Sequence, residues 1–244
     1  MTTVAISQPM YFPWPGFMEM MKISDVFVWL DDAQFSKGSF TNRVQLMTAS
    51  GRKWMTVPLE GKGAFREIRA LRPANDHWRE AHRGLLSRAL SEAPCQNDAL
   101  AVYDAVMEQS GLWQVLIASA EEQARVLDAM PETRLLASQM DVPGASWQRV
   151  IDIVLQVGGT HYVSGAGGAR YLDHSAFERA GIHVSYMEYN PAPWPQAHGE
   201  FTPFVTSLDL IASCGKTAAR HLRPNTVSWR KQLSKVADAN DANN

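Results

Sequence analysis

The length, composition and charge of the chain exclude several classes of protein. The chain has 244 residues, of which 45% are hydrophobic and 20% are charged, as is usual for a globular protein. Its net charge of −2 provides no basic field that would attract nucleic acid or an anionic membrane. Because no Pro/Gly/Ser-rich linker interrupts the chain, we predict a single α/β domain over residues 1–236 and a flexible tail over residues 237–244.

The cysteines and the first residues indicate the compartment. Cys95 and Cys214 lie far apart, in no metal-binding spacing and in no disulfide framework, which favours a reducing cytoplasm. The first residues have no basic stretch followed by a long apolar run, and no apolar stretch approaches the ~18 residues of a membrane span. We therefore expect a cytoplasmic protein without a membrane partner.

The beginning of the chain predicts a strand–helix–strand unit. Residues 3–7 form a short apolar strand, and the prolines that follow it forbid a helix before Gly16. Residues 17–23 are expected to be helical, and residues 26–30 form a continuous apolar run, which is typical of a strand covered on both faces. These elements predict a parallel pair of strands with a right-handed crossover.

A hairpin and a helical middle segment are expected next. The hairpin has strands at residues 43–47 and 53–59 around a turn at Ser50 and Gly51, and residues 67–71 are expected as a third strand beside it. Apolar residues at helical spacing then predict helices over residues 78–90, 98–109, 112–130, 132–140 and 146–156.

The last third of the chain alternates between strand and helix. Strands are expected at residues 162–164 and 182–187, and helices at residues 169–180 and 204–213. This second alternation favours a mostly parallel, Rossmann-like sheet covered by helices. The hairpin and the helical middle segment are then insertions into that fold.

The segment from Gln8 to Phe17, rich in proline and aromatic residues, is the first candidate for a functional site. A rigid loop at the carboxyl end of a strand is where open α/β sheets bind ligands. Gln8 offers both a donor and an acceptor to a polar substrate, and Tyr11 is a second candidate; packing is the alternative role for both. We assign Phe12 and Trp14, like Phe17, to the core.

Asp31 and Asp32 are the second candidates, because two adjacent carboxylates that follow a buried strand need partners or water. One of them would act as a general base or hold an amine or a sugar hydroxyl. The alternative is a helix or turn cap, which aspartate often supplies.

Two further segments are candidates for holding the anionic end of a substrate. Asn42 would orient the substrate, and Arg43 would bind a phosphate or carboxylate in bidentate fashion or pair with one of the aspartates. The loop that begins at Ser164 and Gly165 is glycine-rich and precedes a predicted helix, so its backbone N–H groups are candidates for an anion contact. A simple tight turn is the alternative for this loop.

The remaining candidates are single side chains. His82 is a candidate base, although a packed histidine is the more common role for such a residue. Gln196, in a late Pro/aromatic loop that also holds Glu200, is expected to line the same crevice. No HxxxH, HExxH or Cys/His cluster indicates a metal site, no GxSxG motif indicates a serine hydrolase, and no cofactor is expected.

Taken together, these motifs resemble the WbqC-like protein family over about residues 4–215. The matching segments are Val4 to Trp14 with Gly16, Ser24 to Phe35, Asn42-Arg43, Trp54 to Pro58, Trp78 with His82, Tyr162 to Gly165 with Tyr171-Leu172, and Pro195 to Phe201 with Leu208 to Leu210. The chain departs from the family where members often carry histidine in place of Ser7 and tyrosine in place of Trp194, so no role that needs the imidazole is expected here.

The resemblance implies a step in lipopolysaccharide O-antigen or related glycan biosynthesis. We therefore expect a transferase that tailors a nucleotide-linked sugar, by acyl or aminoacyl transfer to an amino sugar. A non-catalytic binding or scaffold protein of the same pathway is one alternative. A nucleotidyltransferase-like enzyme is another, by fold analogy alone, because the histidine signature of those enzymes is absent.

Overall fold

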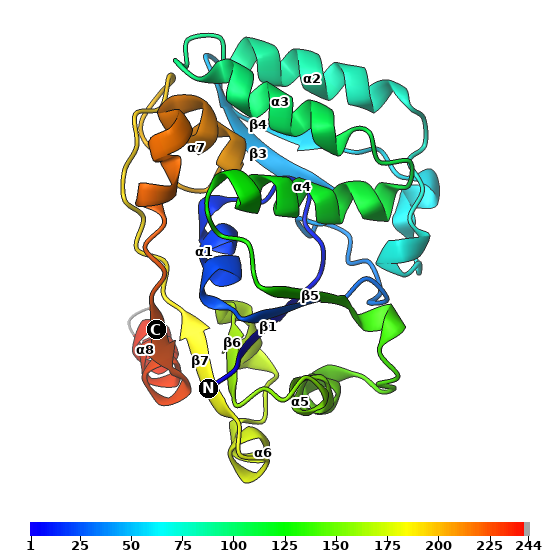
Figure 1. Cartoon of the computed structure of the whole chain (residues 1–244), viewed down its shortest axis with the longest axis vertical. Helices are drawn as coiled ribbons and strands as arrows, with labels where there is room; N and C mark the ends of the chain where they lie inside the picture. Colours follow the sequence, from blue (N-terminus) through cyan, green and yellow to red (C-terminus); the bar gives the residue numbers. More distant parts are fainter. Residues whose placement is uncertain (242–244) are drawn as a thin grey trace.

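The centre of the computed structural model is a six-stranded sheet in the order β5-β2-β1-β6-β7-β8 (Figure 1). The structure describes residues 1–241, and side chains as far as Lys235. The strands are β1 (Thr3–Ser7), β2 (Val26–Trp29), β5 (Thr133–Leu136), β6 (His161–Ser164), β7 (His183–Met187) and β8 (Thr226–Ser228). All neighbours are parallel except β8, which is antiparallel to β7, so the predicted Rossmann-like sheet is confirmed.

Helices cover both faces of this sheet (Figure 1). They are α1 (Pro15–Ile23), α2 (His77–Ala89), α3 (Gln96–Val106), α4 (Leu112–Val126), α5 (Ser146–Gln156), α6 (His174–Arg179), α7 (Ser207–Cys214) and α8 (Trp229–Asp241). Successive strand side chains point to opposite faces. In β2, Phe27 and Trp29 therefore join the core with α1, α4 and α7, whereas Val26 and Val28 join the core with α5 and α6.

The order of the strands reverses beside β1. From β1 the chain passes through α1 to β2 on one side, and β6, on the other side of β1, leads through α6 to β7. The loops that leave β1 and β6 therefore diverge and leave a crevice at the carboxyl ends of these strands, where open α/β sheets bind ligands.

The predicted hairpin is confirmed as a separate two-stranded sheet of β3 (Arg43–Thr48) and β4 (Gly51–Thr56). It lies beside α2 above the main sheet in Figure 1. The Gln45 carbonyl accepts a hydrogen bond from the Thr206 N–H, which ties the hairpin to the start of α7. The hairpin thus lies over the region near the carboxyl ends of the strands.

Three predicted elements were wrong. Residues 132–140 form β5 and the 3-10 turn Ala137–Gln139 because pairing with β2 outweighs the local helical pattern. Residues 67–71 contain the 3-10 turn Ile68–Ala70 and a single bridge between Gln34 and Glu67, without a strand. The helix predicted at residues 169–180 is divided into the 3-10 helix Ala166–Arg170 and α6, since Asp173 caps a new start.

The end of the chain contains elements that we did not predict. β8 and α8 follow α7, and α8 continues to Asp241, into the segment for which we predicted a flexible tail. Residues 242–244 of that segment lie outside the described residues. Within residues 1–241, the structure contains no helix that is both long enough and apolar enough to span a bilayer.

Gly159 provides a test of the packing between α5 and β1. A Cβ at this position would lie 2.5 Å from Val4 Cγ2 and 2.9 Å from the Val154 carbonyl oxygen. We expect Gly159→Ala to lower the free energy of unfolding by roughly 1–3 kcal/mol through overpacking, measured by urea denaturation. Gly167→Ala is the control, because a Cβ there meets open space. Equal stability of the two variants would contradict this packing.

Candidate functional site

A pocket of about 340 Å³ lies at the point where the strand order reverses, and we call it the switch-point pocket. It is lined by Ile6, Ser7, Met10, Trp14, Gly16, Phe17, Met20, Gly165, Ala166, Met187 and Tyr189. These residues come from the ends of β1, β6 and β7 and from the first turns of α1. The pocket therefore occupies the crevice that the topology predicts.

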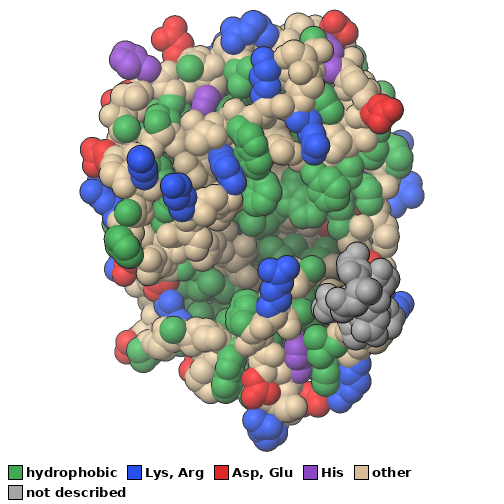
Figure 2. Space-filling view, turned by 180° about the vertical axis from the view of Figure 1, so that it is seen from behind, with side chains coloured by type: hydrophobic (Ala, Val, Ile, Leu, Met, Phe, Trp, Pro, Cys, Tyr) green, Lys and Arg blue, Asp and Glu red, His purple; other side chains and the backbone are tan. Residues whose placement is uncertain are grey.

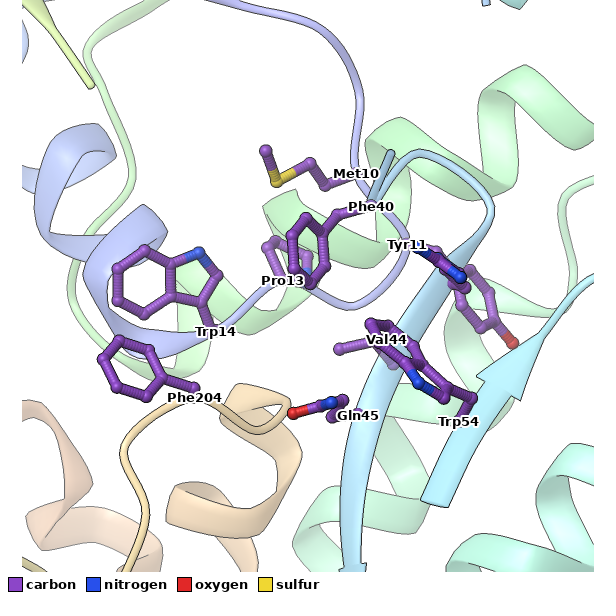
Figure 3. A pocket seen from close by; sticks show the side chains of 10 residues that line it. Met10, Tyr11, Pro13, Trp14, Phe40, Val44, Gln45, Trp54 and Phe204 are labelled. Atoms are coloured by element: carbon purple, nitrogen blue, oxygen red, sulfur yellow. The ribbon is translucent and has the colours of Figure 1, made fainter. Parts of the chain in front are cut away.

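A second cavity of about 310 Å³ continues from the first beneath the hairpin, and we call it the aromatic groove. It is lined by Met10, Tyr11, Pro13, Trp14, Phe40, Arg43, Val44, Gln45, Trp54 and Phe204 (Figure 3). Met10 and Trp14 line both cavities, so the two are adjacent parts of one site. Figure 2 shows hydrophobic side chains around a hollow in one face of the molecule, with Lys and Arg side chains around it.

Trp14 stands at the junction of the two cavities because of its local sequence. It precedes α1, which begins with Pro15, and its indole lies where a Cβ of residue 16 would be. Only glycine leaves room for the ring at that position. The ring centroid of Trp14 is 4.7 Å from that of Tyr189 and 5.6 Å from that of Phe204, so three aromatic side chains form one wall.

The opposite wall comes from the hairpin and the loop before it. The rings of Phe40 and Trp54 lie 5.8 Å apart, and the Arg43 guanidinium lies 4.3 Å from the centre of the Trp54 ring. Figure 3 shows Trp14 and Phe204 on one side of the groove, Phe40 and Trp54 on the other, and Gln45 between them. Phe40, Trp54 and Phe204 are about half exposed, so part of each ring is accessible to a ligand, while Arg43 covers one face of Trp54.

Arg43 and Gln45 are the polar side chains of the aromatic groove. Arg43 donates a hydrogen bond to the Gly38 carbonyl, while its buried Nε has no hydrogen-bond partner within the described residues. Gln45 accepts a weak hydrogen bond of 3.4 Å from Arg52. Since the side chain is only partly buried and no partner of Nη1 is found within the described residues, Nη1 can donate to an anionic group, whereas the buried Nε cannot.

Tyr11 contributes its ring to the groove and not its hydroxyl. The hydroxyl points away from the groove in Figure 3 and lies 2.9 Å from His82 Nδ1. A neutral imidazole that accepts the Tyr11 hydroxyl proton at Nδ1 fits this contact. Burial lowers the pKa of His82 to about 4 and raises that of Tyr11 well above its usual value. This pair links α2 to the loop between β1 and α1, behind the groove.

The paired aspartates have protein partners outside both cavities. Asp31 is buried, and its two carboxylate oxygens accept hydrogen bonds from the Ser138 N–H at 3.0 Å and the Ser138 hydroxyl at 2.6 Å. Asp32 forms a bidentate pair with Arg149, at 3.0 and 2.6 Å. These contacts fasten the end of β2 to β5 and α5. A catalytic role for either aspartate stays a prediction.

The other predicted residues are spread around the site. Gly165 lines the switch-point pocket, and Ser164, buried below it, donates to the Gly165 carbonyl. Gln8 follows β1 between the ends of β2 and β6 and is partly exposed. Asn42 donates to the Val57 carbonyl at 2.8 Å, and Gln196 braces its own loop through both Thr202 and Asp209.

The structure thus brings Tyr11 and Arg43 together in the groove and places Gly165 in the adjoining pocket. Sequence reasoning assigned Trp14 to the core and gave no role to Phe40, Tyr189 or Phe204. The sequence did offer a signal for Trp54. Trp54 lies in the predicted hairpin, and an aromatic side chain on the solvent face of a hairpin is expected to be exposed, as Trp54 is.

The sequence pattern of the WbqC-like protein family matches residues 8–221. The chain belongs to this family. Among curated proteins, the chain is similar to the "Uncharacterized protein Rv1507c" of Mycobacterium tuberculosis (strain ATCC 25618 / H37Rv), with 29% identity over 238 residues, which cover 91% of this chain and 98% of that protein. No solved structure matches the chain. The resemblance inferred from the motifs is therefore confirmed at the level of the family.

His82 gives a prediction for the pH dependence of this WbqC-like protein. Its pKa is about 4 in the folded chain against 6.5 for a free histidine, so only the unfolded chain takes up the proton between these values. Stability should therefore fall as the pH decreases from 6.5 to 4. Between these two pH values, we expect the free energy of unfolding of His82→Gln to fall by about 3 kcal/mol less than that of the parent protein, measured by urea denaturation.

The test uses the difference in the free energy of unfolding between the parent protein and His82→Gln at each pH. His161 and His174 also have lowered pKa values and are present in both proteins, so their contributions cancel in this difference. Parallel pH–stability curves for the two proteins would contradict a buried neutral His82.

Proposed function

We propose that the chain is a transferase that tailors a nucleotide-linked sugar, by acyl or aminoacyl transfer to an amino sugar, in lipopolysaccharide O-antigen or related glycan biosynthesis. One observation supports this above all. Two cavities with different linings meet at Met10 and Trp14, as expected of a site that brings a donor and an acceptor together. Membership of the WbqC-like family supports the pathway.

The aromatic groove is suited to the nucleotide sugar. Exposed faces of Phe40, Trp54 and Phe204 can stack on a nucleobase or on the apolar face of a sugar ring. Gln45 projects between the walls and offers both a donor and an acceptor to the edge of a base. Arg43, which lines the groove, supplies the positive charge that a diphosphate needs.

The switch-point pocket then holds the group to be transferred. In the proposed step, the amine nitrogen of the sugar attacks the carbonyl carbon of an activated acyl or aminoacyl donor. The bond from that carbon to the leaving group breaks, and a proton of the amine is passed to the departing group. Neither cavity has an Asp or Glu among its described lining residues, so positioning contributes most of the rate.

In this proposal, Asp31 and Asp32 have a structural role, because they hold the end of β2 against β5 and α5. Their bonds to Ser138 and Arg149 engage both carboxylates away from the two cavities. Their expected role as proton acceptors would require these bonds to break.

The binding half of the proposal can be tested with one exposed aromatic. Trp54→Ala removes a stacking face while leaving the core intact, so we expect the dissociation constant for nucleotide sugars to rise roughly tenfold or more. The measurement is a thermal-shift screen of nucleotide sugars, followed by calorimetric titration. A ligand at ~100 times its dissociation constant should stabilise the chain by roughly 2.7 kcal/mol.

Phe65→Ala is the matched control, because Phe65 is 92% exposed and lies outside both cavities. If no nucleotide sugar stabilises the protein, or if both variants bind like the parent, the groove does not hold this substrate.

A non-catalytic binding protein of the same pathway is the second candidate, and one observation favours it. The described linings of both cavities lack a carboxylate, and the histidine His82 is sealed behind the groove. The two candidates differ when a nucleotide-linked amino sugar is incubated with activated donors and the products are analysed by mass spectrometry. An acylated or aminoacylated sugar supports the transferase, and binding without any product supports the second candidate.

A further inference from the structure

The walls of the switch-point pocket are apolar on nearly every side. Met10, Met20 and Met187 contribute three flexible thioethers, and the rest of the hydrophobic lining comes from Ile6, Phe17, Ala166 and the rings of Trp14 and Tyr189. The polar groups of its described lining are the Ser7 and Tyr189 hydroxyls, the Trp14 ring N–H and backbone atoms. No Asp, Glu, Lys or Arg of residues 1–235 is among the residues that line it.

This lining excludes a charged occupant. An ammonium or a phosphate in such a pocket would lose its hydration without gaining a partner of opposite charge. The nearest carboxyl on α1 is that of Glu19, which is fully buried and outside the lining, and which accepts a hydrogen bond from the Arg223 N–H at 2.8 Å. Burial raises the pKa of Glu19, which further reduces its suitability as a partner for an ammonium.

The size and the flexibility of the pocket fit an aliphatic chain. Its volume of about 340 Å³ corresponds to roughly ten atoms the size of a water molecule. Methionine side chains are unbranched and polarisable, so three of them can adapt to a flexible hydrocarbon without leaving voids. Trp14, Phe17 and Tyr189 add aromatic surface to this lining, but the neighbouring groove has five aromatic side chains and a single methionine, Met10, in its described lining.

We propose that the switch-point pocket binds an uncharged, medium-length aliphatic acyl chain, with the carbonyl end of the chain at the junction between Met10 and Trp14. This inference rests on the proposed function for its role, because it decides between the acyl and aminoacyl forms of the reaction. The exposed loop at Gly165 and Ala166 forms the mouth of the pocket.

The first test uses acyl thioesters of N-acetylcysteamine as probes, from acetyl through butyryl and octanoyl to palmitoyl, with alanyl thioester as the charged comparison. Affinity for the full chain is measured by calorimetry. Each added methylene should tighten binding about three- to fourfold until the pocket is full, after which the gain should stop. Affinity that is independent of chain length, or stronger for the alanyl probe, would overturn the proposal.

Two variants should change the preferred chain in opposite directions. Ala166→Trp places a large ring at the exposed mouth and should weaken octanoyl binding at least tenfold. Met187→Ala enlarges the pocket and should move the preference to a longer chain. Ala101→Trp, at an exposed alanine of α3, is the matched control and should bind like the parent. Unchanged chain preference in both pocket variants would contradict this placement.

Binding of nucleotide sugars separates this inference from the proposed function. If nucleotide sugars bind and acyl probes do not, the acyl pocket is wrong while the transferase proposal stands in its aminoacyl form. If acyl probes bind with the expected length dependence and nucleotide sugars do not, the acyl pocket stands and the proposed function fails.

Discussion

The contact between the Trp14 indole and Gly16 is the constraint on which the candidate site depends. The ring occupies the space that any side chain at residue 16 would need, and Pro15 starts α1 directly between the two. Trp14 is thereby held at the carboxyl end of β1, where the order of the strands reverses. From this position it forms a wall of both cavities. Without this contact, Met10 would be the one remaining residue that lines both the pocket and the groove.

The rest of the fold supports this arrangement from two sides. Behind the groove, the neutral His82 and the Tyr11 hydroxyl hold α2 against the loop between β1 and α1. At the strand ends, Asp31 and Asp32 fasten β2 to β5 and α5 through Ser138 and Arg149. The polar residues thus stabilise the frame, while aromatic and methionine side chains form the surfaces that a ligand would meet. This division explains why Asp31 and Asp32 lie away from both cavities, whereas Arg43 lines the groove.

Much of the sheet could be predicted from the sequence, because its signals are local. The apolar run of β2, the prolines before α1 and the glycine-rich loop after β6 each depend on neighbouring residues alone. β5 was not predicted because it has only four residues and follows a sequence with a helical pattern. These residues form a strand because they pair with β2. The position of Gly165 at the strand end was also predictable from topology.

The aromatic groove could not be predicted in the same way. Its walls come from residues 10–14, 40–54 and 204, which meet only after the hairpin folds over the sheet and the last loop returns to it. The sequence shows that Asp31 and Asp32 follow a buried strand, but their partners, Ser138 and Arg149, are more than a hundred residues away. Long-range contacts of this kind decided which candidates face a cavity.

The most direct measurement of the central claim is a crystal structure of the protein with a nucleotide sugar and an unreactive acyl analogue bound together. The account predicts the base and sugar between Trp54 and Phe204, the acyl chain among the methionines, and the two reacting ends within contact distance beside Trp14. A separate pocket is lined by Asp32 and Arg149, and density for either molecule there, with both cavities of the site empty, would contradict the account.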